Sequence, residues 1–211
     1  MTYGLNDVVI HRQMIEDSPS PIEQKRVERQ KLDAMLAYCE SAQCRRVVLL
    51  NYFGEDAVPC GNCDVCIDPP QVWDGTVAAQ KALSAALRTG QRFGAGHLID
   101  ILRGKLTDKV RQFGHEGLPT FGVGVDLDEM AWRSVFRQLL ASTFMEADAH
   151  AYGALKVTDA ARPILKGETV LTLRRHSVRS KSKSTISKAP SSRQSNCGVA
   201  MTGDDALYFE A

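Results

Sequence analysis

The stretch Cys60-Gly61-Asn62-Cys63-Asp64-Val65-Cys66 decides how the middle of this chain folds, because it brings three thiols close together. Cysteines separated by two residues can point at one ion, each about 2.3 Å from zinc. Gly61 and Asn62 tolerate the unusual backbone angles of such a turn. Pro59 and the pair Pro69-Pro70 keep helices from running through it. The pattern predicts a metal site; the alternative is a group of reduced cysteines that are unligated or redox-active.

The fourth ligand must come from another part of the chain. Cys39 and Cys44 lie upstream, and Cys197 lies far away in a polar tail. Cys44 is the better candidate, because it follows a turn-like stretch and opens a helical segment, whereas Cys39 is the alternative. Four thiolates on one divalent cation leave a local charge of minus two, which Arg45 and Arg46 are placed to offset. A site closed by four cysteines has no vacant position, so we expect a structural zinc rather than a catalytic one.

The composition is that of an ordinary globular protein. The chain has 211 residues, of which 44% are hydrophobic and 24% charged. No stretch approaches the roughly 20 apolar residues that span a bilayer, and the N-terminus lacks the pattern of a signal peptide. We therefore expect reduced thiols, a cytoplasmic location and no membrane partner.

Charge is distributed unevenly along the chain. Of 26 basic and 25 acidic residues, seven and three fall in residues 174–211, which leaves 19 and 22 in residues 1–173. The basic residues of the tail alternate with serines, a composition typical of disordered linkers. We predict a basic linker over residues 173–202. The remaining part is slightly acidic, so nucleic-acid binding there requires a local basic patch.

Hydrophobic periodicity divides the rest of the chain into a zinc-binding platform and a second module. In residues 19–72 we predict a helix from about Ile22 to Cys39 and another from Cys44 to Phe53, joined to the cysteine-rich turn. The charged side of the first helix is interpreted as its solvated face, and the alternative is a nucleic-acid site. Residues 1–18 have no helix-start signal and too little apolar surface to fold alone.

The second module, residues 73–172, is predicted as helices followed by a β-hairpin. Thr76 and either Asp126 or Asp128 are candidate N-caps, and Gly90 and Gly104 are candidate C-terminal stops. The expected helices span residues 76–89, 96–102, 107–113, 127–142 and 159–165, and the hairpin strands span residues 144–148 and 154–158. The fold class is therefore mainly α, with a winged-helix outline, a helix-turn-helix variant that binds DNA.

In this layout the segment Thr107 to Phe113 is the candidate recognition helix. Basic side chains there would hold phosphates without reading sequence. The predicted DNA-binding residues are Arg103, Lys105, Lys109, Arg111 and His115. The alternative is a winged helix that docks another protein.

Several stretches together resemble the C-terminal half of RecQ-type DNA helicases, over roughly residues 5–172. They include Cys44-Arg45-Arg46, the segment from Leu49 to Glu55, and the segment from Cys60 to Pro70. Further matches are Gln91-Arg92-Phe93-Gly94, Leu102-Arg103-Gly104, Phe113-Gly114-His115, Phe121-Gly122-Val123-Gly124, Trp132, Arg137-Gln138-Leu139, Leu155-Lys156-Val157-Thr158 and Ala161-Arg162-Pro163. The resemblance implies that the four zinc ligands are Cys44, Cys60, Cys63 and Cys66. It also implies that the winged helix contacts duplex DNA beside the point of strand separation.

The resemblance does not include the family's motor. The chain has no Gly-rich phosphate loop, no acidic metal-binding box and no arginine-finger segment. We expect residues 1–18 to be a remnant of the second motor lobe, and ATP and Mg²⁺ to be needed only by the full-length parent. Residues 203–211 resemble the start of the small helical domain, of helicase-and-RNase-D C-terminal type, that often follows. Tyr152 at the hairpin tip is a candidate strand-separating aromatic or a turn residue.

The leading hypothesis is the zinc-stabilised, duplex-binding accessory region of a 3′-to-5′ ATP-dependent helicase that acts in DNA repair and recombination. It implies forked or double-stranded DNA as partner, with other repair proteins or the motor, and a monomer at the bacterial nucleoid. Loss of one thiolate should then unfold residues 22–70. The alternative is a free-standing winged-helix regulator, which usually dimerises and reads bases.

A zinc hydrolase is the least favoured class. The histidines show no HExxH or similar ligand spacing, and each is expected to be a lone surface or capping residue. They are His11, His97, His115, His150 and His176.

Overall fold

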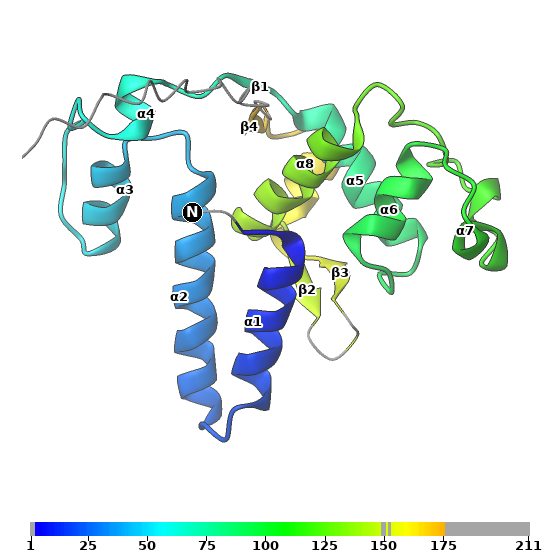
Figure 1. Cartoon of the computed structure of the whole chain (residues 1–211), viewed down its shortest axis with the longest axis horizontal. Coiled ribbons are helices and arrows are strands. Elements are labelled where there is room, and N and C mark those ends of the chain that lie inside the picture. Colours follow the sequence, from blue (N-terminus) through cyan, green and yellow to red (C-terminus); the bar gives the residue numbers. More distant parts are fainter. Residues whose placement is uncertain (1–2, 149–150, 152, 176–211) are drawn as a thin grey trace, which may run out of the picture. The chain divides into compact units, whose positions relative to one another are not determined.

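The computed structural model describes residues 3–148, 151 and 153–175. These residues are mainly α-helical, with two small two-stranded sheets, which confirms the predicted fold class (Figure 1). Several predictions lie outside the described residues. They concern His150, Tyr152, His176, Cys197, the linker beyond Arg175 and the C-terminal helix start.

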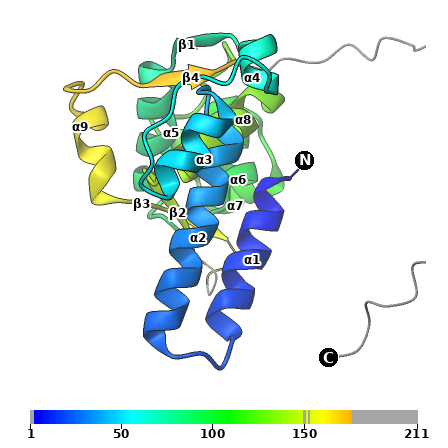
Figure 2. The ribbon, with the colours of Figure 1, turned by 90° about the vertical axis from the view of Figure 1, so that its left-hand side faces the viewer.

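Two helices that run side by side open the described chain (Figure 2). They are α1 (Leu5–Asp17) and α2 (Ile22–Glu40), and α2 agrees with the predicted helix. Helix α1 was not anticipated. It begins where the Gly4 amide donates to Asp7 at 2.8 Å, and it buries Val8 against α2 and a later helix. Part of the apolar surface of residues 1–18 is thus buried by packing against other helices.

The cysteine-rich segment contributes two short helices with little core of their own. They are α3 (Arg45–Tyr52) and α4 (Asp64–Ile67), and Cys44 is the residue before the first turn of α3. Helix α3 has no buried residue and α4 has only Val65. Gly54, with φ of 81°, takes the chain out of α3. Packing alone therefore does little to hold this segment.

The second module contains the first four of the five predicted helices, with shifted ends. They are α5 (Thr76–Arg88), α6 (Ala95–Leu102), α7 (Asp108–Gln112) and α8 (Glu129–Ala141), with a 3₁₀ turn, η1, at His115–Gly117. Asp128 caps α8 by accepting from the Ala131 amide at 2.7 Å. The prediction that Thr76 caps α5 is wrong. Gly75 holds that position, and the Thr76 hydroxyl and amide instead donate to Asp74 at 2.6 and 3.0 Å.

The predicted hairpin is present. Strands β2 (Met145–Asp148) and β3 (Ala154–Val157) pair antiparallel, with Glu146 opposite Lys156. The helix expected next is divided into a 3₁₀ turn, η2 (Asp159–Ala161), and α9 (Arg162–Leu165).

A second sheet, which the sequence did not predict, joins the two ends of this module. Strand β1 (Val72–Asp74) pairs antiparallel with β4 (Thr172–Arg174). Leu173 is only 2% exposed and belongs to the main core. The ordered chain therefore continues past residue 173, where the linker was expected to begin.

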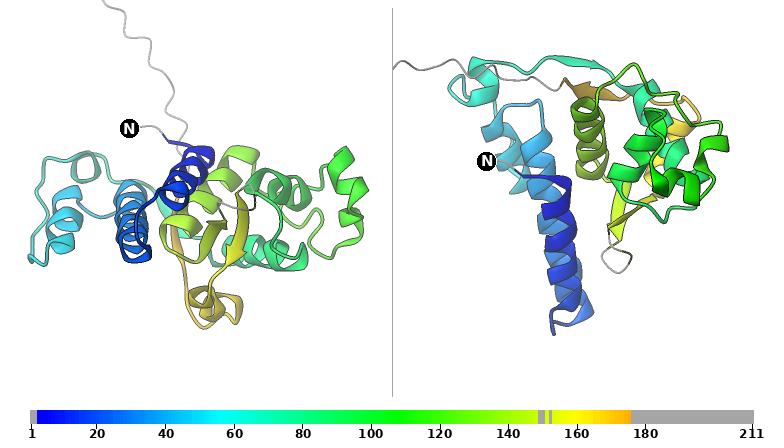
Figure 3. Two further views of the ribbon diagram at one scale, coloured as in Figure 1. Left: turned by 90° about the horizontal axis from the view of Figure 1, so that it is seen from below. Right: turned by 45° about the vertical axis from the view of Figure 1, so that its right-hand side comes forward.

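The main core lies where α5, α6, α8 and the β2–β3 hairpin meet (Figure 3). Trp132 is fully buried in it, and its indole donates to the Gly124 carbonyl at 2.8 Å. A β-carbon at Gly124 would lie 2.5 Å from that ring, so only glycine fits. A smaller cluster of Val8, Leu36 and Ala141 joins α1, α2 and α8.

Candidate metal centre and nucleic-acid interface

Four cysteines converge at the junction of α2, α3 and α4. The Sγ atoms of Cys44, Cys60, Cys63 and Cys66 all lie within 4.8 Å of one another. The Sγ of Cys44 is 3.5 Å from that of Cys60 and 3.9 Å from that of Cys63. A tetrahedral zinc with bonds of about 2.3 Å needs sulfurs about 3.8 Å apart. The arrangement therefore fits a closed four-thiolate zinc site.

Local backbone geometry aims these thiols inward. Cys44 precedes the first turn of α3, and Cys63 precedes the first turn of α4, where free amides point outward. Gly61, with φ of 71°, makes the turn between Cys60 and Cys63, the first two cysteines of the Cys60–Cys66 knuckle. Cys39 lies outside the cluster, and its carbonyl accepts from Arg174 at 3.2 Å. Of the two upstream candidates, the structure brings only Cys44 to the knuckle.

Backbone amides favour the thiolate form that a metal requires. Donation by the amides of Cys60 and Val47 lowers the pKa of Cys44 to about 6. The pKa of Cys63 is lowered chiefly by the Arg45 amide. Hydrogen bonding with Cys63 raises the pKa of Cys66 to about 11. The fold therefore favours the thiolate form at Cys44 and Cys63 and disfavours it at Cys66.

Arg45 braces the site rather than serving only as a counter-charge. Its Nε is 3.1 Å from the Asp64 carboxylate, and its Nη1 donates to the carbonyls of Tyr38 and Ser41. One side chain therefore ties the end of α2 to the start of α4. Arg46 is exposed, with no ion pair among the described residues.

The predicted DNA-binding residues differ in how free their charges are. Lys109 and Arg111 project from α7, are exposed, and form no ion pair within the described part of the chain. Arg103 and Lys105 are partly neutralised, because they lie 3.4 Å from Glu129 and 3.6 Å from Asp100. Of the predicted DNA-binding residues, the cations available for phosphates are therefore those of α7.

His115 is a packing residue in this structure. It is 9% exposed, and its Nδ1 lies 2.8 Å from Nε2 of His97, which is 8% exposed. The expectation that both histidines are lone surface or capping residues is wrong. Burial lowers the pKa of His115 and, together with the charge of His115, lowers that of His97 to about 4. His115 is therefore poorly placed to meet a phosphate.

Arg92 is a candidate contact that the sequence analysis missed. It is exposed, forms no ion pair in the described ranges, and is close enough to His115 to lower its pKa. The neighbouring Phe93 ring lies 5.9 Å from the Lys109 ammonium. The motif Gln91-Arg92-Phe93 was the available signal, but nothing in it shows that a loop lies next to α7.

Comparisons with known proteins agree with this geometry. Residues 69–182 match the family model described as RQC domain, and residues 5–67 match RecQ zinc-binding. The second match includes α1, so the assignment of residues 1–18 to a motor lobe stays a prediction. Among the described helices, none is long and apolar enough to cross a membrane.

Curated relatives carry helicase names. The chain is 43% identical over 166 residues to "ATP-dependent DNA helicase RecQ" of Pasteurella multocida, covering 78% of this chain and 26% of the relative. It is 43% identical to the protein of the same name in Haemophilus influenzae, covering 76% and 26%. The Bacillus subtilis protein of that name is 30% identical, covering 80% and 28%. The chain thus spans about a quarter of these relatives.

Proposed function

The chain belongs to the RQC domain family and carries a RecQ zinc-binding segment, and on that premise we propose that it is the zinc-stabilised, duplex-DNA-binding region of a RecQ-type 3′-to-5′ helicase. The observation that carries the proposal is the convergence of four thiols beside a winged helix whose α7 presents unpaired cations.

The zinc would be held by Cys44, Cys60, Cys63 and Cys66. When bound, it supplies structural cross-linking and no reactive position, because four protein ligands close the shell. The chain's own residues do the rest. Arg45 fixes α4 against the end of α2, and α2 in turn packs on α8 of the winged helix.

Duplex binding would use Lys109, Arg111 and Arg92. Their charges are exposed and unpaired in the described structure, so binding phosphates does not require breaking an ion pair. Each contact made to a phosphate displaces condensed counterions, which makes the affinity fall with salt and leaves it insensitive to sequence. Arg103 and Lys105 would contribute less, because Glu129 and Asp100 compete for them.

The wider role rests on the named relatives, which are ATP-dependent helicases. ATP and Mg²⁺ would act on motor segments that this chain does not contain, and we propose that the chain alone does not hydrolyse ATP. Forked DNA, the motor and other repair proteins are the proposed partners, in repair and recombination. The proposed state is a monomer on nucleoid DNA in the bacterial cytoplasm.

The test is the affinity of the full chain for a blunt 20-base-pair duplex across a salt series. Replacing Lys109 and Arg111 with Gln should weaken binding about tenfold or more and reduce the salt slope by about two. Lys166→Gln is the matched control, because it removes an exposed cation that already lies near Glu168.

Unrelated duplex sequences should bind the wild-type chain equally. An unchanged affinity and salt slope in the double variant would overturn the assignment of α7. A footprint that requires a palindrome would instead indicate a sequence-specific regulator.

A further inference from the structure

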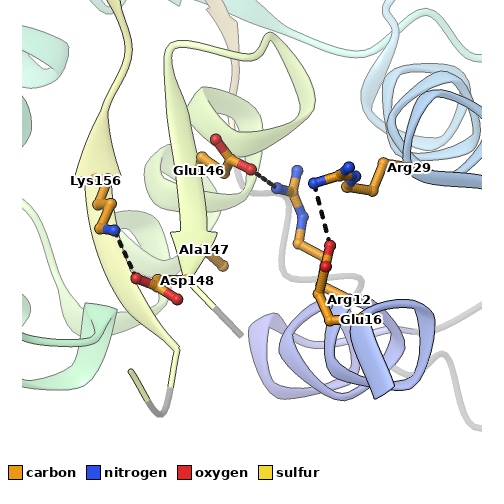
Figure 4. Close-up of a pocket in the computed structure, with 7 residues that line it drawn as sticks. All are labelled: Arg12, Glu16, Arg29, Glu146, Ala147, Asp148 and Lys156. Carbon is orange, nitrogen blue, oxygen red and sulfur yellow. Dashed lines mark hydrogen bonds and ion pairs between the residues drawn. The ribbon is translucent and has the colours of Figure 1, made fainter. Parts of the chain in front are cut away.

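A buried arginine connects the zinc-binding helices to the winged-helix hairpin. Arg12 lies on α1 and is 5% exposed. Its Nη2 donates to Asp33 of α2 at 2.6 Å, and its Nη1 donates to Glu146 of β2 at 3.1 Å. Figure 4 shows the Arg12 guanidinium reaching the Glu146 carboxylate from the helix side of the cavity. One side chain therefore joins three elements.

The other ion pairs lining this cavity of about 270 Å³ stay within one side of it. Arg29 of α2 pairs with Glu16 of α1 at 3.2 Å, and Lys156 of β3 pairs with Asp148 of β2 at 2.6 Å (Figure 4). Among these lining residues, the bond between Arg12 and Glu146 is the ion pair that crosses from the helices to the hairpin.

The two carboxylates that pair with Arg12 differ in how exposed they are. A buried guanidinium requires its carboxylates, since an unpaired buried charge is strongly destabilising. In the described part of the chain, the Nε of Arg12 is buried without a hydrogen-bond partner, and the ion pairs of the guanidinium are those with Asp33 and Glu146. The Asp33 side chain is 28% exposed and that of Glu146 is 52% exposed. Loss of Glu146 leaves Arg12 paired with Asp33, so the charge between the helices stays compensated while the hairpin loses its ion pair to α1.

The register of the hairpin leaves Glu146 available for this contact. Glu146 lies opposite Lys156, but the Lys156 ammonium bonds the diagonal neighbour Asp148. Met145 and Ala147, on the other face of β2, are buried in the main core. The alternation of the strand thus sends Glu146 towards α1 while its neighbours anchor the strand.

We propose that Arg12 is a positioning residue, which holds the β2–β3 hairpin in one orientation against α1 and α2 and so sets how the winged helix meets duplex DNA. The part that concerns DNA rests on the proposed function. The part that concerns the hairpin does not, because it can be measured without DNA.

The test uses Glu146→Gln in the full chain, since this exposed side chain can be changed without burying an unpaired charge. Glu168→Gln is the matched control, because it removes one carboxylate from an exposed ion pair beyond the hairpin. Hydrogen exchange of the β2 and β3 amides should become about tenfold faster in Glu146→Gln and stay unchanged in the control. Arg12→Lys, which keeps the charge but not the two-pronged geometry, should show a smaller increase than Arg12→Gln.

Two further measurements decide the proposal: hydrogen exchange in a double variant and affinity for duplex DNA. In an Arg12→Gln background that still binds metal, Glu146→Gln should add nothing, because the bond it removes is already lost. For the blunt duplex, Glu146→Gln should bind at least threefold more weakly than Glu168→Gln. Unchanged hydrogen exchange of the hairpin amides overturns the proposal that the Arg12–Glu146 ion pair positions the hairpin. Faster exchange with equal DNA affinity of the two variants overturns its role in DNA binding, while the assignment of α7 is judged separately by Lys109 and Arg111.

Discussion

At the scale of single residues, the pair His97 and His115 shows how burial changes what a histidine does. The rings share one hydrogen bond. His97 stacks on Phe93, His115 meets the same ring edge-on, and the Lys109 ammonium lies over that ring. Lys109 disfavours protonation of His97, and Asp100 opposes this only weakly. We therefore expect both rings to be neutral near pH 7, where they pack against Phe93, the ring that lies under Lys109 of α7.

The pair predicts acid sensitivity. The pKa of His97 is about 4 in the folded chain and close to 6.5 when unfolded, so the unfolded chain takes up the proton first as pH falls. The free energy of unfolding should drop by about 1–2 kcal/mol between pH 7 and pH 5 from this group alone. In urea titrations, His97→Phe should lose that part of the pH dependence, whereas the exposed-site control His11→Gln should keep it. Equal pH dependence in all three proteins would contradict this account.

At the scale of elements, the zinc-binding segment is held by two different means. Helices α3 and α4 bury almost nothing, so we expect them to depend on the cysteine cluster. Helix α2 packs on α8 through Leu36 and is tied to α1 through Arg12 and Asp33. We therefore expect the metal-dependent segment to be shorter than the residues 22–70 predicted from the sequence.

Removal of the metal should melt part of this segment and spare the rest. With a strong chelator, amides of Arg45–Tyr52 and Asp64–Ile67 should exchange freely, because metal binding and local folding are coupled there. Amides in the middle of α2 should remain protected. Hydrogen exchange with and without chelator measures both. Loss of protection in α2 together with α3 would show that the metal, not the contact with α8, holds that helix.

At the scale of the whole described structure, the two family-matched segments are joined by a shared interface. The apolar cluster of Val8, Leu36 and Ala141 spans it. Around it, Arg137 pairs with Glu40 at 3.2 Å, and the Tyr3 hydroxyl donates to the same carboxylate at 2.6 Å. Burial and this hydrogen bond raise the pKa of Tyr3. The zinc segment is thereby anchored directly on α8, the helix that carries Trp132 of the winged-helix core.

The sequence predicted those features that depend on local pattern. The spacing of the cysteines identified the cluster, and apolar periodicity found α2, α5, α6 and α8, because each signal lies within a few residues. Strands β1 and β4 were not predicted. Each has three residues, which is too short for an alternating pattern, and the two strands lie far apart in sequence. Helix α1 was missed because its single buried apolar side chain, Val8, gains its core from α2 and α8.

The candidate site shows the same division. The position of Lys109 and Arg111 on a short exposed helix could be predicted, because both lie within one basic segment. The sequence did not predict the burial of His115, the availability of Arg92 or the compensation of Arg103 by Glu129. Each depends on contacts between segments that are separated in sequence. The contact between Arg12 and Glu146 likewise joins residues far apart in the chain, so no local pattern signals it.

The most direct test of the central claim is the metal content of the purified full chain, measured by elemental analysis on wild type, Cys44→Ala and Cys39→Ala. The account predicts one zinc per chain in the wild type and in Cys39→Ala, because Cys39 lies outside the cluster. It predicts loss of most of the zinc in Cys44→Ala, since three thiolates no longer close the site. No zinc in the wild type, full zinc in Cys44→Ala, or loss of zinc in Cys39→Ala would contradict the four-thiolate site.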